Sequence, residues 1–266
     1  MHASAELASL VVPTRVTTRS VNLVSDTLDS LGEFDLIVCG FVLNELFEKE
    51  TEERALQARV SLLEKLGQRL SEHGSLIVLE PALKQTSRNL SRARDLLTVS
   101  SQLNVFAPCV RTGPCPMLLS ERDWCHESTP YALPEAAAEL ARGAGLRFEG
   151  LSFSYLTLRR DGRRLSDTLS GRGGPFRVVS DPLPSKGKHE LYGCGEDGRV
   201  RLTLLLRDES EPNRVLLELG RGDVFSTAVG PLTDAEGAEI KRKITATVAV
   251  TRLENAQDPL QRADDL

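Results

Sequence analysis

Two apolar runs of strand length, with an amphipathic helix between them, constrain the fold of this chain most strongly. The runs lie at 34–39 and 75–79, and the segment 52–70 between them places leucines at helical spacing among charged residues. Such runs are typical of strands that are buried on both faces of a parallel sheet. A strand, a helix and a strand with short connections form a βαβ unit, so the sequence predicts an α/β domain with a mostly parallel sheet.

Further elements extend this α/β domain, which we expect to span residues 21–158. A poorly ordered leader, 1–20, is expected to precede it. The later of two additional helices begins with a proline in its first turn and ends at glycines, as helices commonly do. The additional elements are strands at 21–24 and 148–158 and helices at 86–100 and 134–144.

The character of the sequence changes after residue 158. Short strand candidates bounded by Gly, Pro, Asp or Asn follow one another, which is typical of a small β-rich unit. We expect this basic appendage to span 159–230, followed by a weakly patterned tail, 231–266, whose end frays. The strand candidates are 176–180, 189–193, 199–206 and 214–219.

Charge is distributed unevenly along the 266 residues, whose formal net charge is −5. Residues 26–80 carry 12 acids and 5 bases, whereas 141–207 carry 13 bases and 7 acids. The acidic net charge excludes a chain that coats nucleic acid by its overall charge, but the basic stretch is a candidate RNA contact. A solvated charged face is the alternative explanation.

Other features of the composition exclude further classes of protein. No apolar run approaches the ~20 residues that a membrane-spanning helix needs. The start lacks the basic and apolar regions of a secretory signal, and the five cysteines are an odd number. A disulfide scaffold is therefore excluded, and the cysteines point to metal or thiol chemistry.

Four of the five cysteines lie in loops rather than in the apolar runs. Cys109, Cys115 and Cys125 are separated by five and nine residues in a loop, 107–126, and Cys194 follows far downstream between two glycines. Four thiolates suit tetrahedral zinc or an iron–sulfur cluster, and the spacing does not distinguish between them. Four unrelated buried thiols are the alternative.

The other candidate ligands and catalytic groups are weaker. Cys39 lies within an apolar strand, so we assign it to the core. His126 directly follows Cys125 and is an alternative ligand, but we favour a structural histidine beside Trp124. No histidine lies in a recognisable nucleophile motif, and no carboxylate pair stands out among 38 acids, so the catalytic residues are unknown.

Taken together, these segments resemble a family of methyltransferase-like proteins associated with the small ribosomal subunit, including the mitochondrial one. The resemblance extends from about residue 21 to 225, and its specific part is the set of cysteines that neighbour proline and tryptophan. The matching segments are 35–38 with 42–46, then 74–81, 91–97, 107–116, 124–126, 186–189 leading to Cys194, and 222–223.

The resemblance implies a class I methyltransferase fold, whose Rossmann-like sheet binds S-adenosylmethionine at the carboxyl ends of its strands. It also implies that the partners are small-subunit rRNA and ribosomal proteins and that the role is assembly or stability of the subunit. Neither DNA nor a membrane is expected as a partner. A 4Fe–4S cluster is implied as well, with Cys109, Cys115, Cys125 and Cys194 as its ligands.

The sequence departs from the family pattern at the glycine-rich loop that holds the cofactor in a working class I methyltransferase. No G-x-G follows a strand near the N-terminus, and the glycines at 171–174 come too late and do not open a helix. We therefore expect a sheet without its first one or two strands, and methyl transfer that is weak or absent. The remaining candidate cofactor contacts are Asp26, Gly40, Asn44 and Glu45, with Glu80 and Pro81 at the border of the same pocket.

The sequence thus predicts an rRNA-associated assembly factor of the small ribosomal subunit. In this interpretation the cluster staples the basic β-rich part to the methyltransferase-like part, because a metal centre that joins distant segments is a structural link. The alternatives are an active S-adenosylmethionine-dependent RNA methyltransferase and a zinc-binding structural protein. The expected location is the bacterial cytoplasm, since no clear targeting segment is visible, with the mitochondrial matrix as the alternative.

Overall fold

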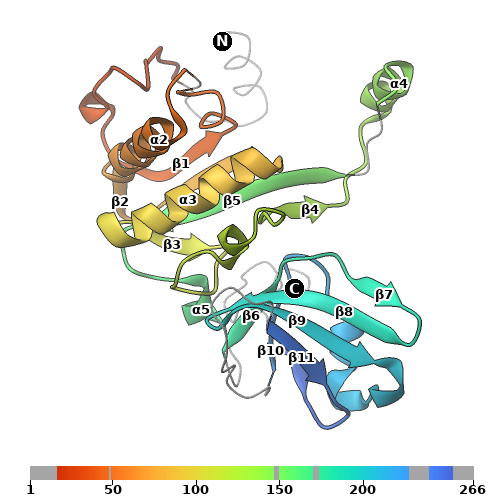
Figure 1. Ribbon diagram of the computed structural model, residues 1–266. Coiled ribbons are helices and arrows are strands. Elements are labelled where there is room, and N and C mark those ends of the chain that lie inside the picture. Colours follow the sequence, from red (N-terminus) through yellow and green to blue (C-terminus); the bar gives the residue numbers. More distant parts are fainter. Residues whose placement is uncertain (1–16, 48, 147–149, 170–173, 228–239, 254–266) are drawn as a thin grey trace, which may run out of the picture.

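The computed structural model describes residues 17–47, 49–146, 150–169, 174–227 and 240–253. In these residues the chain forms two β-sheets, each with its own apolar core, and the two lie one above the other in Figure 1. No helix within the described ranges is both long enough and apolar enough to cross a membrane. Most of the predicted leader, the glycines at 171–173 and the end of the predicted tail lie outside the described residues.

The first sheet belongs to the α/β domain and is mixed. Its strand order is β1-β2-β5-β3, with β4 paired to β5. The predicted βαβ unit is confirmed, because β1 and β2 are parallel. A mostly parallel sheet was the wrong expectation, since β5 runs antiparallel to β2, β3 and β4. The sheet strands are β1 (Phe34–Gly40), β2 (Leu70–Pro81), β3 (Asn104–Ala107), β4 (Glu127–Thr129) and β5 (Leu151–Arg159).

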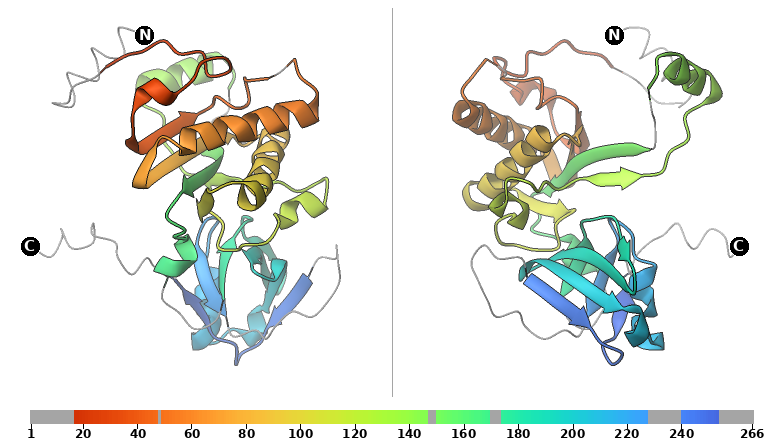
Figure 2. Two further views of the ribbon diagram at one scale, coloured as in Figure 1. Left: turned by 90° about the vertical axis from the view of Figure 1, so that its left-hand side faces the viewer. Right: turned by 45° about the vertical axis from the view of Figure 1, so that its right-hand side comes forward.

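The two long helices, α2 (Glu52–Gly67) and α3 (Lys84–Ser100), pack against one face of this sheet (Figures 1 and 2). Leu63 of α2, Leu97 of α3 and Val78 of β2 are fully buried between the helices and the strands. A mixed sheet with packed helices fits the Rossmann-like methyltransferase fold. The third helix, α4 (Glu135–Gly143), stands away from this body beyond the β4–β5 pair, and none of its residues is buried.

Two sequence predictions for the α/β domain were wrong in detail. Leu36 and Val38 are 55% and 57% exposed, so β1 is not buried on both faces, because the described helices α2 and α3 cover only the opposite face. The segment 21–24 forms a turn rather than a strand. There the side chain of Asn22 accepts hydrogen bonds from the backbone N–H groups of Val24 and Ser25, which is typical of an Asx turn.

The second sheet forms the β-rich domain, with the strand order β11-β9-β8-β6-β10-β12 and β7 paired to β8. Its core includes Leu191, Leu202, Leu204 and Phe225, all of which are at most 1% exposed. The strands predicted at 176–180, 189–193 and 199–206 are confirmed. The strands are β6 (Pro175–Val178), β7 (Leu183–Ser185), β8 (Lys188–Gly195), β9 (Gly198–Leu205), β10 (Val224–Thr227), β11 (Ile240–Ile244) and β12 (Val250–Arg252).

Two predictions for the C-terminal part were wrong. The segment predicted as a strand at 214–219 belongs instead to a 3-10 helix, η4 (Glu211–Leu217). Ser210 and Asn213 cap its start reciprocally and Pro212 stands in its first turn, so the local signals favour a helix over a strand. The segment expected to be a weakly patterned tail contributes β11 and β12 to the sheet.

A buried carboxylate makes the stability of the β-rich domain dependent on pH. Glu190 of β8 accepts a hydrogen bond from Arg201, pairs with Lys188 and accepts from Thr203, and these contacts lower its pKa to about 2. A lowered pKa stabilises the folded state above the unfolded pKa of about 4.3, and that stabilisation is lost as the pH falls towards 2. We expect the free energy of unfolding to fall by about 2 kcal/mol over this range. Urea titrations between pH 5 and 2 measure the loss, and a Glu190→Gln chain should show much less of it.

Candidate functional site

The cysteine-rich loop leaves the α/β sheet at the end of β3 and returns to it at β4. Cys109 follows the cis peptide bond between Ala107 and Pro108, and Cys115 directly precedes the 3-10 helix η2 (Pro116–Leu119). Cys125 lies two residues before β4, and Cys194 comes from β8 of the other domain. The loop therefore lies where the two sheets meet (Figure 1).

The four thiols predicted as a set are brought to one place. Burial raises the pKa of Cys194 well above its ordinary value, and Cys109, Cys125 and Cys115 add to this shift. Burial, followed by the neighbouring Cys125 and Cys109, likewise raises the pKa of Cys115 to about 12. Neighbouring thiolates raise one another's pKa by electrostatic repulsion, so these shifts place Cys194 in the neighbourhood of the three loop cysteines, and all four residues are partly buried.

A cavity lies beside three of these thiols, those of Cys109, Cys115 and Cys125. Tyr155 of β5 lines it, and burial, followed by Cys109 and Cys125, raises the pKa of the tyrosine to about 12. Arg94 of α3 and Arg177 of β6 bring two guanidinium groups to the same cavity, and these residues are only 1% and 4% exposed. Positive charge at this depth favours a negatively charged occupant or charged sulfur ligands.

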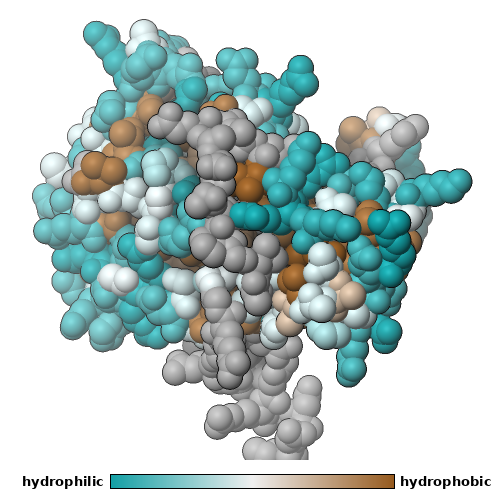
Figure 3. All heavy atoms as spheres, turned by 60° about the horizontal axis from the view of Figure 1, so that its bottom comes forward, coloured by the Kyte–Doolittle hydropathy of each residue, from teal (hydrophilic) through white to brown (hydrophobic). Residues whose placement is uncertain are grey.

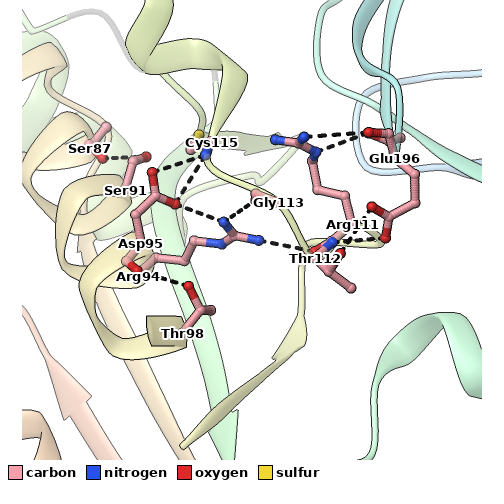
Figure 4. Close-up of polar contacts among 11 residues, drawn as sticks. Ser87, Ser91, Arg94, Asp95, Thr98, Arg111, Thr112, Gly113, Cys115 and Glu196 are labelled. Carbon is pink, nitrogen blue, oxygen red and sulfur yellow. Dashed lines mark hydrogen bonds and ion pairs between the residues drawn. The ribbon is translucent and has the colours of Figure 1, made fainter. Parts of the chain in front are cut away.

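Helix α3 fixes the loop between the first two cysteines (Figure 4). Arg94 donates hydrogen bonds to the carbonyl oxygens of Gly113 and Arg111, at 2.6 and 3.0 Å, and pairs with Asp95 at 2.7 Å. Both carboxylate oxygens of Asp95 accept from the backbone N–H of Cys115, each at 3.0 Å. One arginine and one aspartate from adjacent positions thus set the path of the chain from Cys109 to Cys115.

A second arginine of the same helix fixes the loop between the second and third cysteines. Arg88 donates to the carbonyl oxygens of Met117, Ser120 and Asp123 at 2.7 to 3.0 Å. The indole N–H of Trp124 donates to the carbonyl of Ala82 at 3.1 Å, next to Cys125. The loop therefore has a defined conformation although it contains little regular structure.

The β-rich domain contacts the third cysteine through Arg177. Its guanidinium lies 3.8 Å from the sulfur of Cys125 and forms an ion pair with Glu127 of β4. Gly222 stands against the same carboxylate with a φ of +93°, and a Cβ atom there would lie 2.8 Å from Glu127 Oε2. A glycine is needed at this position, both for the backbone conformation and for the close approach.

Further polar contacts cross between the domains beside the fourth cysteine. Arg111 donates to the carbonyl of Gly195 at 3.0 Å, and the backbone N–H of Thr112 donates to Glu196 at 2.8 Å (Figure 4). Arg199 of β9 pairs with Asp123 at 2.7 Å. The junction is therefore polar and charged, with the thiols at its centre.

The donor chemistry of this site fits a soft metal or an iron–sulfur cluster, since three thiols and two buried guanidinium groups line one cavity and the thiol of Cys194 lies near enough to be affected by all three. Within the part of the chain that the structure describes, no three His, Cys, Asp or Glu side chains are placed so that they could hold a single metal ion as they stand. The residue types and their neighbouring positions fit a soft metal or an iron–sulfur cluster. The described side chains, however, do not surround a single metal position.

The weaker ligand candidates lie as the sequence predicts. Cys39 is 6% exposed in the core of the α/β domain, and burial raises its pKa to about 11. His126 stacks on Trp124 with ring centroids 5.7 Å apart, and burial, followed by Arg221, lowers its pKa. The burial of Cys39 supports a structural role. His126 also lines the cavity of the three thiols, and its buried Nδ1 atom has no hydrogen-bond partner among the described residues, so its role stays a prediction.

A second cavity lies at the carboxyl ends of β1 and β2, where the sequence predicts cofactor contacts. Asn44 and Glu80 line it, and the buried Glu80 carboxylate accepts from the backbone N–H groups of Leu43 and Asn44 at 2.9 and 3.0 Å. Burial raises the pKa of Glu80. Glu45 is exposed and is not among the residues that line this cavity.

The other two predicted cofactor contacts lie outside that cavity. Gly40 ends β1, and the space where its Cβ would lie is open. Asp26 is exposed and accepts from the backbone N–H of Asn22 at 2.8 Å, so it stabilises the turn in which it lies. The cofactor-binding role of all four predicted residues stays a prediction.

Sequence reasoning missed the arginines that build the thiol site. Arg88 and Arg94 lie on an amphipathic helix, where arginines are ordinarily solvated, and Arg177 lies in a short strand. One signal was available: Arg94 and Asp95 fall within a segment that carries the family resemblance. Their contacts with loops distant in sequence could not be deduced from spacing.

The family of the chain follows from a comparison with known proteins. A protein-family model described as "Mitochondrial small ribosomal subunit Rsm22" matches residues 2–229. The matched range contains the four loop and strand cysteines, Cys109, Cys115, Cys125 and Cys194, and the three arginines Arg88, Arg94 and Arg177. A comparison with curated proteins gives no match.

Proposed function

Because this chain belongs to the Rsm22 family of the mitochondrial small ribosomal subunit, we propose that it acts as an assembly factor of that subunit. Family membership gives it a methyltransferase-like role associated with the small subunit. The more specific proposal is that its two domains are stapled together by a 4Fe–4S cluster and that the β-rich domain contacts rRNA.

The observation that carries the proposal is the origin of the four thiols. Cys109, Cys115 and Cys125 come from a loop of the α/β domain, whereas Cys194 comes from a strand of the β-rich domain. A cluster bound to all four would supply metal–sulfur bonds across the junction and would hold the domains together. Chain contacts alone at this junction are hydrogen bonds and ion pairs, which are individually weaker.

We propose a 4Fe–4S cluster as the occupant of the junction, with zinc as the alternative. Four thiolates suit either group. Arg94 and Arg177 provide positive charge that offsets the negative charge of a cluster with four thiolate ligands.

The charge of the β-rich domain supports association with rRNA. Figure 3 views the molecule from the side of this domain and shows a largely hydrophilic surface around smaller apolar areas. Exposed bases there include Arg207, with 77% of its side chain accessible, and Lys243, with 52%. The name of the family supports the mitochondrial matrix as the location, so we propose it over the bacterial cytoplasm that the sequence favours.

The proposal is tested by measuring iron, sulfide and zinc on anaerobically purified full-length protein, together with its absorption spectrum. We expect a brown protein with a broad visible band and about four irons per chain. A colourless protein with one zinc per chain would retain the staple and overturn the cluster. Protein that carries neither metal under these conditions would overturn both.

A further inference from the structure

The strands β8, β9 and β11 have two chemically different faces. Their inward side chains, which include Leu191, Leu202 and Ile244, are at most 1% exposed in the core of the β-rich domain. Side chains alternate between the two faces of a strand, so the residues between these apolar positions point outward. The outward residues carry five bases, one acid and one tyrosine: Lys188, Glu190 and Tyr192 in β8, Arg199 and Arg201 in β9, and Lys241 and Lys243 in β11. We call this set the basic sheet face.

The register of the sheet arranges these side chains in rows. Tyr192 is opposite Arg201, which is opposite Lys241, and in the next row Thr203 is opposite Lys243. Neighbouring strands are about 4.8 Å apart, and residues on one face of a strand repeat at about 6.7 Å. The bases therefore form a compact array on three adjacent strands rather than a scattered surface charge.

An aromatic ring lies within this array. The guanidinium groups of Arg199 and Arg201 lie 4.8 and 5.9 Å from the centroid of the Tyr192 ring. Stacked arginine and tyrosine side chains present flat surfaces as well as positive charge. Flat surfaces of this kind accept unstacked bases, which single-stranded RNA offers and a continuous helix does not.

The carboxylates near the basic sheet face cancel only part of its charge, because three acids stand against five bases. Glu190 is the single acid among the outward residues of the three strands and pairs with both Lys188 and Arg201. From outside the three strands, Asp208 pairs with Lys243 at 3.4 Å and Asp123 pairs with Arg199 at 2.7 Å. The side chains of Lys188 and Lys243 remain 38% and 52% exposed despite these contacts. The Lys243–Asp208 pair is of the weak, exposed kind in which a phosphate can replace the carboxylate, whereas the buried Glu190 retains its own partners.

We propose that the basic sheet face binds a single-stranded segment of RNA through its phosphates. This inference rests on the proposed association with rRNA and specifies the surface and the form of RNA that it recognises. Arg199 is opposite Cys194 in the register, so the face ends at the row that contributes the fourth thiol. The bound strand would therefore run along the β-rich domain up to the junction between the domains.

The test uses the full-length protein and two fluorescent probes from small-subunit rRNA, an unstructured oligonucleotide and a duplex that contains it. In the double variant Lys241→Glu/Lys243→Glu we expect affinity for the single strand to fall at least tenfold at 100 mM salt. The slope of log K against log [salt] should become shallower by about 1.4, because each lost phosphate contact on a single strand contributes about 0.7. Both lysines are exposed, so the variant should fold.

The matched control is Arg54→Glu/Lys65→Glu, which makes the same change of charge on exposed positions of α2 and should leave the slope unchanged. If the lysine variant does not fold, Lys241→Gln/Lys243→Gln replaces it. This inference, but not the proposed rRNA association, would be overturned if a folded lysine variant kept the wild-type affinity and salt slope. An equal loss in the control variant, tighter binding of the duplex, or binding to anionic vesicles instead of RNA would also overturn it. A wild-type protein that binds neither probe would overturn the proposed rRNA association itself.

Discussion

A Cys194→Ser chain is expected to lose at least nine-tenths of its iron and to release the β-rich domain from the α/β domain. In the proposed cluster Cys194 is the one ligand that comes from the β-rich domain, so its loss would remove every metal–sulfur bond between the domains. We expect the single unfolding transition of the wild type to separate into two, because each domain has its own apolar core. Iron analysis and chemical denaturation followed by circular dichroism measure the two effects.

The matched control for this experiment is the fifth cysteine. Cys39 lies in the core of the α/β domain, so Cys39→Ala should retain its iron while losing about 1 kcal/mol of stability. Cys115→Ser should behave as Cys194→Ser does, with lower solubility or weaker association with rRNA and an α/β core that stays partly folded. Unchanged iron, folding and RNA binding in either site variant would contradict the staple.

The second large effect is expected at Arg94, whose replacement by alanine should lower the free energy of unfolding by about 3 kcal/mol. The substitution removes the donors for the carbonyls of Gly113 and Arg111 and leaves Asp95 without its cation. Unpaired buried carbonyls and an unpaired carboxylate each carry a desolvation cost. Chemical denaturation of the wild type and the variant in parallel gives the difference.

A neighbouring arginine provides the comparison for Arg94. Arg92 lies two positions before Arg94 on the same helix, has 39% of its side chain exposed and pairs with Glu52 at the surface. Arg92→Ala should cost less than about 1 kcal/mol, as exposed ion pairs generally do. Equal losses in the two variants would show that the loop does not depend on the buried guanidinium.

The sequence was most informative where its local signals agreed with one another. The βαβ unit from β1 to β2, helix α3 and strand β9 each combine periodic apolar residues with clear boundaries, and the structure contains all three. The antiparallel placement of β5 between β2 and β3 was not predictable, because strand order is decided by tertiary packing. At 214–219 the apolar pattern favours a strand, whereas the capping residues Ser210 and Asn213 favour a helix, and the structure has a 3-10 helix there.

The cysteines of the candidate site could be predicted from the sequence, but the contacts that hold them in position could not. Loop cysteines flanked by proline and glycine are directly visible in the sequence. The grouping of Cys194 with the other three was predicted from these loop cysteines, and the family resemblance implies the same set. The supports depend on pairs such as Arg177 with Cys125 and Arg111 with Gly195, which are 52 and 84 residues apart. Separations of that size carry no periodic signal, so such contacts have to be seen in the structure.

The position of Cys194 on β8 also has a consequence for the order of events during synthesis. Cys125 and Cys194 are separated by 68 intervening residues, so at about 5–20 residues per second the fourth thiol emerges roughly 3 to 14 seconds after the third. Throughout that interval a nascent chain would hold only three of the four proposed ligands. The fourth thiol therefore reaches the site only when β8 pairs with β9. A chain whose synthesis stops before this hairpin would have three of the four thiols and no β8–β9 pair.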